Sequence, residues 1–172
     1  DTATEGEDEP RDTDSDPCAD EIILTLGTGM SGYEPLDEND PLVHVHLAGL
    51  EYWYYVLAFE VYNSNQIVEV DISAVDVDSG SLVVNSAYHL SLIMDSDDEC
   101  RGTYYSAMAF IELPENLIDG ECDTPPEVLT DHLIQFSIDL VDDDGKQGSD
   151  TLTITGAVDT SYPDTTDCHD ED

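Results

Sequence analysis

Residues 41–62, PLVHVHLAGLEYWYYVLAFEVY, determine the expected fold class. In a strand, side chains two residues apart share a face, and one face of the second half of this stretch is wholly apolar. That face consists of Trp53, Tyr55, Leu57, Phe59 and Val61. The opposite face is mixed and consists of Tyr52, Tyr54, Val56, Ala58, Glu60 and Tyr62. The pattern predicts the central strand of a β-sandwich.

Other segments show the same alternation and are separated by turns rich in Gly, Asp, Asn and Pro. The further strand candidates are residues 21–26, 42–47, 67–75, 82–94, 103–111, 132–141 and 151–158. No segment has a convincing helical period. The inward side chains expected in the two longest candidates are Leu82, Val84, Tyr88, Leu90, Leu92 and Met94, and Ile134, Phe136, Ile138 and Leu140. We therefore predict an all-β fold, an Ig-like antiparallel β-sandwich of about eight or nine strands.

The ends of the chain differ in composition from its middle. Residues 1–17 are acidic and rich in Thr and Ser, so they cannot bury apolar area and are expected to form a solvated tether. Residues 18–168 are expected to form a single β-sandwich domain, and residues 169–172 an acidic tail.

The charge balance limits the possible partners. The chain has 42 Asp and Glu against 3 Lys and Arg, a formal net charge of −39. Between residues 21 and 156 the only basic side chains are Arg101 and Lys146. Such a field repels nucleic acid and anionic lipid, so neither is expected as a direct partner, whereas cations and basic partners are favoured. Adaptation to saline surroundings is an alternative explanation of the same charge.

Four cysteines, Cys18, Cys100, Cys122 and Cys168, permit three pairings. We expect Cys100–Cys122, closing a local excursion, and Cys18–Cys168, joining the two ends of the domain. No Cys-x-x-Cys spacing suggests zinc or redox chemistry. Disulfides indicate an oxidising compartment, so the protein is expected to be extracellular or on the outer-membrane surface, without direct insertion into the membrane. The opening sequence is typical of a mature N-terminus, and a lipid anchor on an upstream residue is a further hypothesis.

Two regions resemble known families. Residues 136–158, FSIDLVDDDGKQGSDTLTITGAV, resemble the last two strands of bacterial immunoglobulin-like and polycystic-kidney-disease-type repeats. The wider layout resembles uncharacterised secreted lipoproteins of myxobacteria and their relatives. The matching residues are Pro17-Cys18, Glu21, Gly27-Thr28-Gly29, Pro35-Leu36, Asp40-Pro41-Leu42-Val43-His44 and Trp53. The resemblance implies the fold class and export, and implies no activity.

The first candidate site is a pair of histidines, His44 and His46. Two positions apart on one strand, both imidazoles can face one zinc or copper ion. The candidates for a third ligand are Glu51, His89 and His132. The alternative is that the pair belongs to a half-exposed strand face without a metal.

The second candidate site is an Asp-rich turn, where Asp142, Asp144 and Asp150 could supply oxygen ligands to calcium. Similar acidic turns surround Asp76 and Asp95. A complete twelve-residue calcium loop with its terminal Glu is absent, and Asp and Gly are also ordinary turn residues. Calcium is the one cofactor that we expect.

The third candidate site is aromatic. If Tyr52, Tyr54 and Tyr62 are exposed, they could stack on sugars or anchor a protein partner.

No Gly-x-Ser-x-Gly or His-Glu-x-x-His motif points to catalysis. We therefore predict a non-catalytic, cell-surface binding or structural module that binds an unknown protein or glycan. An exported metal-binding protein and a glycan-binding accessory domain are the alternatives.

Overall fold

The computed structural model describes residues 18, 21–47, 52–118 and 124–159. The predicted tether at residues 1–17 and the tail at residues 169–172 lie outside this part. The strands within it are β1 (Ile23–Thr28), β2 (Glu34–Pro35), β3 (Pro41–His46), β4 (Trp53–Tyr62), β5 (Ile67–Asp76), β6 (Leu82–Ser91), β7 (Ile93–Met94), β8 (Arg101–Phe110), β9 (Leu133–Asp142) and β10 (Gln147–Val158). A 3-10 turn, η1 (Glu115–Leu117), and one short helix, α1 (Pro125–Leu129), complete the list. The prediction of an all-β fold is confirmed.

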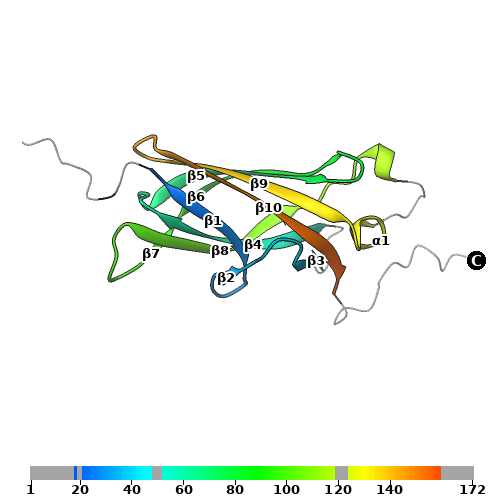
Figure 1. Ribbon diagram of the computed structural model, residues 1–172, viewed down its shortest axis with the longest axis horizontal. Coiled ribbons are helices and arrows are strands. Elements are labelled where there is room, and N and C mark those ends of the chain that lie inside the picture. Colours follow the sequence, from blue (N-terminus) through cyan, green and yellow to red (C-terminus); the bar gives the residue numbers. More distant parts are fainter. Residues whose placement is uncertain (1–17, 19–20, 48–51, 119–123, 160–172) are drawn as a thin grey trace, which may run out of the picture.

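The strands form two layers joined through β3 (Figure 1). In one layer β4 lies between β1 and β8, with β2 beside β1 and β7 beside β8. The other layer has the order β10-β9-β5-β6. Its inward side chains on β9 are Ile134, Phe136, Ile138 and Leu140, all fully buried as predicted. The Tyr55 and Phe136 rings meet in a T-shaped contact at a centroid distance of 5.3 Å, so the layers pack directly on each other.

Strand β3 departs from the predicted antiparallel pattern. Its first four residues pair in parallel with β10, and its last two residues pair antiparallel with β4. One strand therefore hydrogen bonds to both layers and closes one side of the sandwich. The periodicity of a segment identifies a strand but does not specify its neighbours, which is why a wholly antiparallel arrangement was expected.

A β-bulge shifts the register of β6. Ala74 pairs with Val84 and Val75 pairs with Leu82, which leaves Val83 as an extra residue. Val83 and Val84 are consequently both buried, whereas Leu82 is 49% exposed. The prediction that Leu82 points inward was wrong, because strict alternation fails wherever a strand carries an extra residue.

Helix α1 was not predicted, because its five residues are too short to display a helical period. Thr124 precedes it, and the Thr124 backbone N–H donates to the Glu127 carboxylate at 2.9 Å, half of a capping box. Leu129 at the other end is fully buried in the core. The helix therefore closes the end of the sandwich next to β10.

The disulfide joins Cys18 to Cys100, so both predicted pairings, Cys100–Cys122 and Cys18–Cys168, were wrong. The reason lies in the sheet. Ile23, Tyr62 and Arg101 form one row across β1, β4 and β8, which places the starts of β1 and β8 at the same end. Residues 82 apart in sequence thus come within 5.5 Å, measured between their Cα atoms. Cys122 and Cys168 lie outside the described residues.

Candidate functional site: an aromatic groove

A groove opens where β6 and β8 diverge. Val84 and Ile111 form an isolated bridge, and the Glu112 N–H donates to the Val83 carbonyl at 2.9 Å. Beyond this point β6 follows β5 in one layer, while β8 follows β4 in the other. The space between them has a volume of about 590 Å³ and is lined by Leu47, Tyr52, Asn85, Ser86, Phe110, Ile111 and Glu112.

Aromatic side chains form one wall of this groove. Tyr52, immediately before β4, is 57% exposed and meets the half-buried Phe110 ring edge-on at a centroid distance of 6.2 Å. Tyr54 supports Phe110 from behind at 6.0 Å and is itself buried. A buried ring thus holds two accessible rings in place. Such a pre-organised aromatic wall can pack against an apolar group without losing much conformational entropy.

Polar groups also line this groove. Asn85 and Glu112 are exposed and Ser86 is half-buried, which provides an amide, a carboxylate and a hydroxyl within one opening. An aromatic wall facing a few hydrogen-bonding groups is the usual composition of a ligand-binding site. The arrangement can hold a ligand by stacking and by hydrogen bonds to its polar groups.

The three predicted binding tyrosines do not lie together. Tyr52 lines the groove, whereas Tyr54 is only 7% exposed. Tyr62 lies at the opposite end of β4, ten residues from Tyr52, roughly 33 Å along an extended strand. There the Arg101 guanidinium lies 5.5 Å from the centroid of the Tyr62 ring. Only Tyr52, among these three described residues, is thus free to contact a ligand in the groove.

His44 and His46 have different surroundings. His44 is fully buried, and its Nδ1 lies 2.7 Å from the Ala157 carbonyl, which can only accept, so Nδ1 carries the proton. Nε2 then accepts from the Tyr55 hydroxyl at 2.8 Å. His46 instead packs on the Trp53 ring at a centroid distance of 4.7 Å. A metal at His44 would have to displace Tyr55 or the Ala157 carbonyl from the imidazole.

Burial explains the ionisation of His44. Desolvation lowers its pKa from 6.5 to about 4, although the hydrogen bond to the Ala157 carbonyl acts in the opposite direction. The backbone packs closely here, because a Cβ on Gly156 would lie 3.1 Å from His44 Cε1 and 2.2 Å from the Leu129 carbonyl oxygen. The imidazole is therefore a neutral, hydrogen-bonded part of the core.

The predicted calcium ligands are separated as well. The Asp142 carboxylate accepts the N–H groups of Asp144, Lys146 and Asn65 at 2.9–3.2 Å, and thereby orders the β9–β10 turn. Asp150 lies four residues beyond Lys146, roughly 13 Å along β10. No group of three or more His, Cys, Asp or Glu in the described part of the chain is arranged to hold a metal. Calcium binding stays a prediction that solution measurements must test.

Asp76, His132 and Ser79 form a polar cluster around the buried Asp76 carboxylate, and its geometry is that of a structural turn. The Asp76 carboxylate accepts from His132 Nδ1 at 2.9 Å and from the Ser79 hydroxyl and N–H. Burial raises the pKa of Asp76, but the hydrogen bonds from Ser79 and His132 outweigh burial and hold it below its usual value. In a nucleophilic triad the imidazole lies between the hydroxyl and the carboxylate, whereas here the carboxylate lies between the other two.

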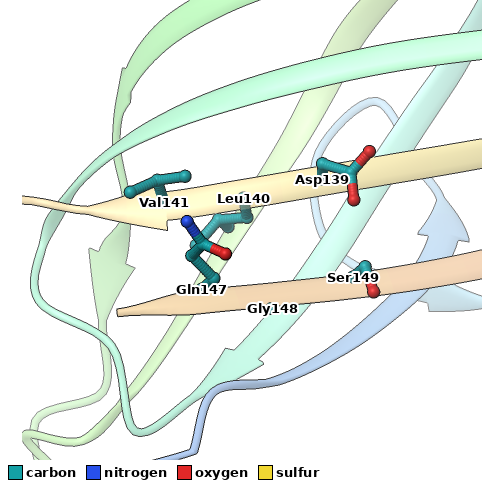
Figure 2. A pocket seen from close by; sticks show the side chains of 6 residues that line it. All are labelled: Asp139, Leu140, Val141, Gln147, Gly148 and Ser149. Carbon is teal, nitrogen blue, oxygen red and sulfur yellow. The ribbon is translucent and has the colours of Figure 1, made fainter. Parts of the chain in front are cut away.

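A second depression, with a volume of about 290 Å³, lies along the β9–β10 hairpin. Figure 2 shows its lining residues, Asp139, Leu140, Val141, Gln147, Gly148 and Ser149. Its side chains come from adjacent positions of two strands and form no wall. We therefore regard the groove at Tyr52 as the candidate site.

Sequence reasoning missed Phe110, Asn85, Ser86 and Glu112 as parts of the site. Their segments are 25 residues apart and approach Tyr52 only because β6 and β8 diverge on either side of one bridge. No periodic signal encodes that divergence. An exposed aromatic residue at the end of a strand was the one available clue.

Comparison with known proteins adds no family. No protein-family model and no curated protein matches the chain. Among solved structures, a β-glucuronidase from Bacteroides uniformis is similar over 74% of this chain and 12% of its own length, with 13% identity and a TM-score of 0.31. No helix in the part described above is long and apolar enough to span a membrane.

Proposed function

We propose that this protein is a non-catalytic, Ig-like binding module that works outside the cell and contacts a protein partner through the groove at Tyr52. The observation that carries the proposal is the exposed Tyr52 ring, held on Phe110 at the mouth of a groove of about 590 Å³. Exposed aromatic residues in a rigid setting are typical binding hot spots.

Two further observations support the proposal. In one layer the order β1-β4-β8-β7, and in the other the order β5-β9-β10, correspond to the A-B-E-D and C-F-G orders of an Ig sandwich. The Cys18–Cys100 disulfide favours an oxidising compartment, at the cell surface or beyond. Both are properties that extracellular recognition modules share.

A glycan is the second candidate ligand. Tyr52 could stack on a sugar ring while Asn85 and Glu112, which also line the groove, bind its hydroxyl groups. This composition would suit either a glycan or a polypeptide, so the test must include both ligand classes.

The test is a binding screen of the purified protein on arrays of extracellular proteins and of glycans, repeated with Tyr52→Ser. The matched control is Met30→Ser, because Met30 is 63% exposed and does not line the groove. We expect binding to proteins that Tyr52→Ser abolishes and Met30→Ser retains. Binding to glycans alone would favour the second candidate, and equal profiles for wild type and Tyr52→Ser would exclude the groove.

A further inference from the structure

Among the described residues, strand β6 has a hydrogen-bonding edge that is unpaired over most of its length. Leu92 N–H donates to the Gln66 carbonyl, and the register of β5 with β6 then places the backbone groups of residues 86, 88 and 90 toward β5. The N–H and C=O groups of Ala87, His89 and Ser91 consequently point away from the sheet. No described residue pairs with this side of β6 beyond the Val84–Ile111 bridge.

Beyond the bulge at Val83, this edge lacks the features that normally prevent strand addition. Natural edge strands carry charged residues, Pro or bulges, or are very short. Strand β6 is ten residues long, with the sequence LVVNSAYHLS, and contains no acid, Lys, Arg or Pro. In a chain with 42 acidic residues, an acid-free edge strand of this length stands apart. It is therefore a ready template for another extended chain.

The outer face beside this edge is acidic. Asp71 on β5 lies directly between Asp139 on β9 and Ala87 on β6. Two carboxylates face each other across adjacent strands here, an arrangement that repulsion destabilises unless a cation lies nearby. Figure 2 shows Asp139 on β9. Because Ala87 is small, a Lys or Arg on a strand added to β6 could extend over it toward Asp71.

We propose that β6 binds an extended, basic peptide segment of a partner as an additional strand along residues 86–91. The hydrogen bonds involve the outward backbone groups of Ala87 and His89, and a basic side chain extends over Ala87 toward Asp71 and Asp139. The inference rests on the proposed function of the groove at Tyr52, because Ser86 lines that groove and is also the first residue of the segment 86–91. It names the chemistry of the protein partner.

A second copy of the chain fits this edge less well. Self-pairing of β6 would bring two chains of net charge −39 together. It would also bring two rows containing Asp71 and Asp139 toward each other, with no basic residue on β6 to separate them. Repulsion of this kind opposes association, whereas it favours a basic partner.

The test uses a capped eight-residue peptide of alternating lysine and valine, and two isomers that are N-methylated on all four lysines or on all four valines. Consecutive residues of an added strand point their N–H groups to opposite sides, so one isomer alone loses the hydrogen bonds to β6. Binding is measured by titration calorimetry in about 0.3 M salt, where charges more than roughly 6 Å apart are screened. We expect one isomer to bind like the parent peptide and the other to lose at least about tenfold in affinity.

The isomer that fails also reports the direction of the added strand. With a lysine opposite Ala87, a loss of affinity on lysine methylation indicates antiparallel addition of the peptide. A loss of affinity on valine methylation then indicates parallel addition. Equal binding of the two isomers would show attraction by charge alone and would overturn the proposal, as would the absence of binding by the parent peptide.

Protein variants provide the second measurement. Ala87→Pro removes an N–H that β5 does not use, so we expect the fold to persist and peptide binding to fall about tenfold. Asp71→Asn should weaken binding and reduce its salt dependence, whereas Asp143→Asn, an equal charge change in the β9–β10 turn, which β5 separates from β6, should have a smaller effect. If Tyr52→Ser abolishes partner binding while Ala87→Pro has no effect, strand addition is wrong and the groove remains the binding site. A dimer whose formation Ala87→Pro prevents would assign β6 to a second copy and overturn the proposal.

Discussion

The two ends of β4 carry similar side chains in different settings. At one end Tyr62 lies against the Arg101 guanidinium, which also forms an ion pair with Glu60, and the adjacent Cys100 is disulfide-bonded to Cys18. At the other end Tyr52 is exposed beside Phe110 at the mouth of the groove. Tertiary neighbours, and not residue type, therefore decide whether an aromatic side chain stabilises the fold or is available to a ligand.

The largest effect is expected at the Tyr62 end of β4, from removal of its disulfide. Cys18→Ser removes a cross-link that spans 82 residues, and the chain-entropy relation predicts a loss of about 4.5 kcal/mol in the free energy of unfolding. Urea unfolding of both proteins measures it. As a control, the difference should disappear in a reducing buffer. Equal stability in oxidising buffer would contradict the importance of the disulfide.

The next largest effect concerns His44 on β3, the strand that pairs with β4 next to Tyr52. Because its folded pKa of about 4 lies below its unfolded value of 6.5, the unfolded chain takes up the proton first. Stability should therefore fall as the pH decreases from 6.5 to 4, and His44 should contribute about 3 kcal/mol to this fall.

Comparison with His44→Gln isolates this contribution, since many carboxylates titrate near pH 4 in both proteins. Urea unfolding of the variant between pH 7 and pH 4 should show a shallower decline. The same slope in both proteins would mean that His44 does not remain neutral in the core.

A smaller effect is expected from the ion pair at the Tyr62 end of β4. Arg101→Met removes the partner of Glu60 and the cation over Tyr62, and should lower the free energy of unfolding by less than either change above, because the Arg101 side chain is 39% exposed. Thermal unfolding at low and high salt measures the effect. The difference from wild type should shrink as salt rises, whereas a salt-independent difference would indicate lost packing instead.

The smallest effect on stability is expected at the Tyr52 end of β4. Tyr52→Ser should change the free energy of unfolding by no more than about 0.5 kcal/mol, because the side chain is mostly exposed. Urea unfolding beside Met30→Ser provides the comparison. A loss of several kcal/mol would mean that Tyr52 supports the fold and that the two ends of β4 do not differ as described.

Individual strands show where prediction from the sequence succeeds and where it fails. On β9 every predicted inward residue is buried, because its alternation is uninterrupted. On β6 the single extra residue Val83 exposes Leu82, and no property of the local sequence marks that bulge. The candidate site was predicted only as far as Tyr52, because Asn85, Phe110 and Glu112 come from other segments.

The amino-acid sequence by itself determined the all-β class, the inward faces of regular strands such as β9, and the strongly acidic character of the chain. These properties depend on residue type and on a period of two, both of which are local. The tertiary structure alone decided the Cys18–Cys100 pairing, the parallel contact of β3 with β10, and which tyrosine and which strand edge stay accessible. These features depend on the register between segments far apart in sequence, where backbone hydrogen bonding is nearly the same for every residue type and the packing of the whole core selects the partner.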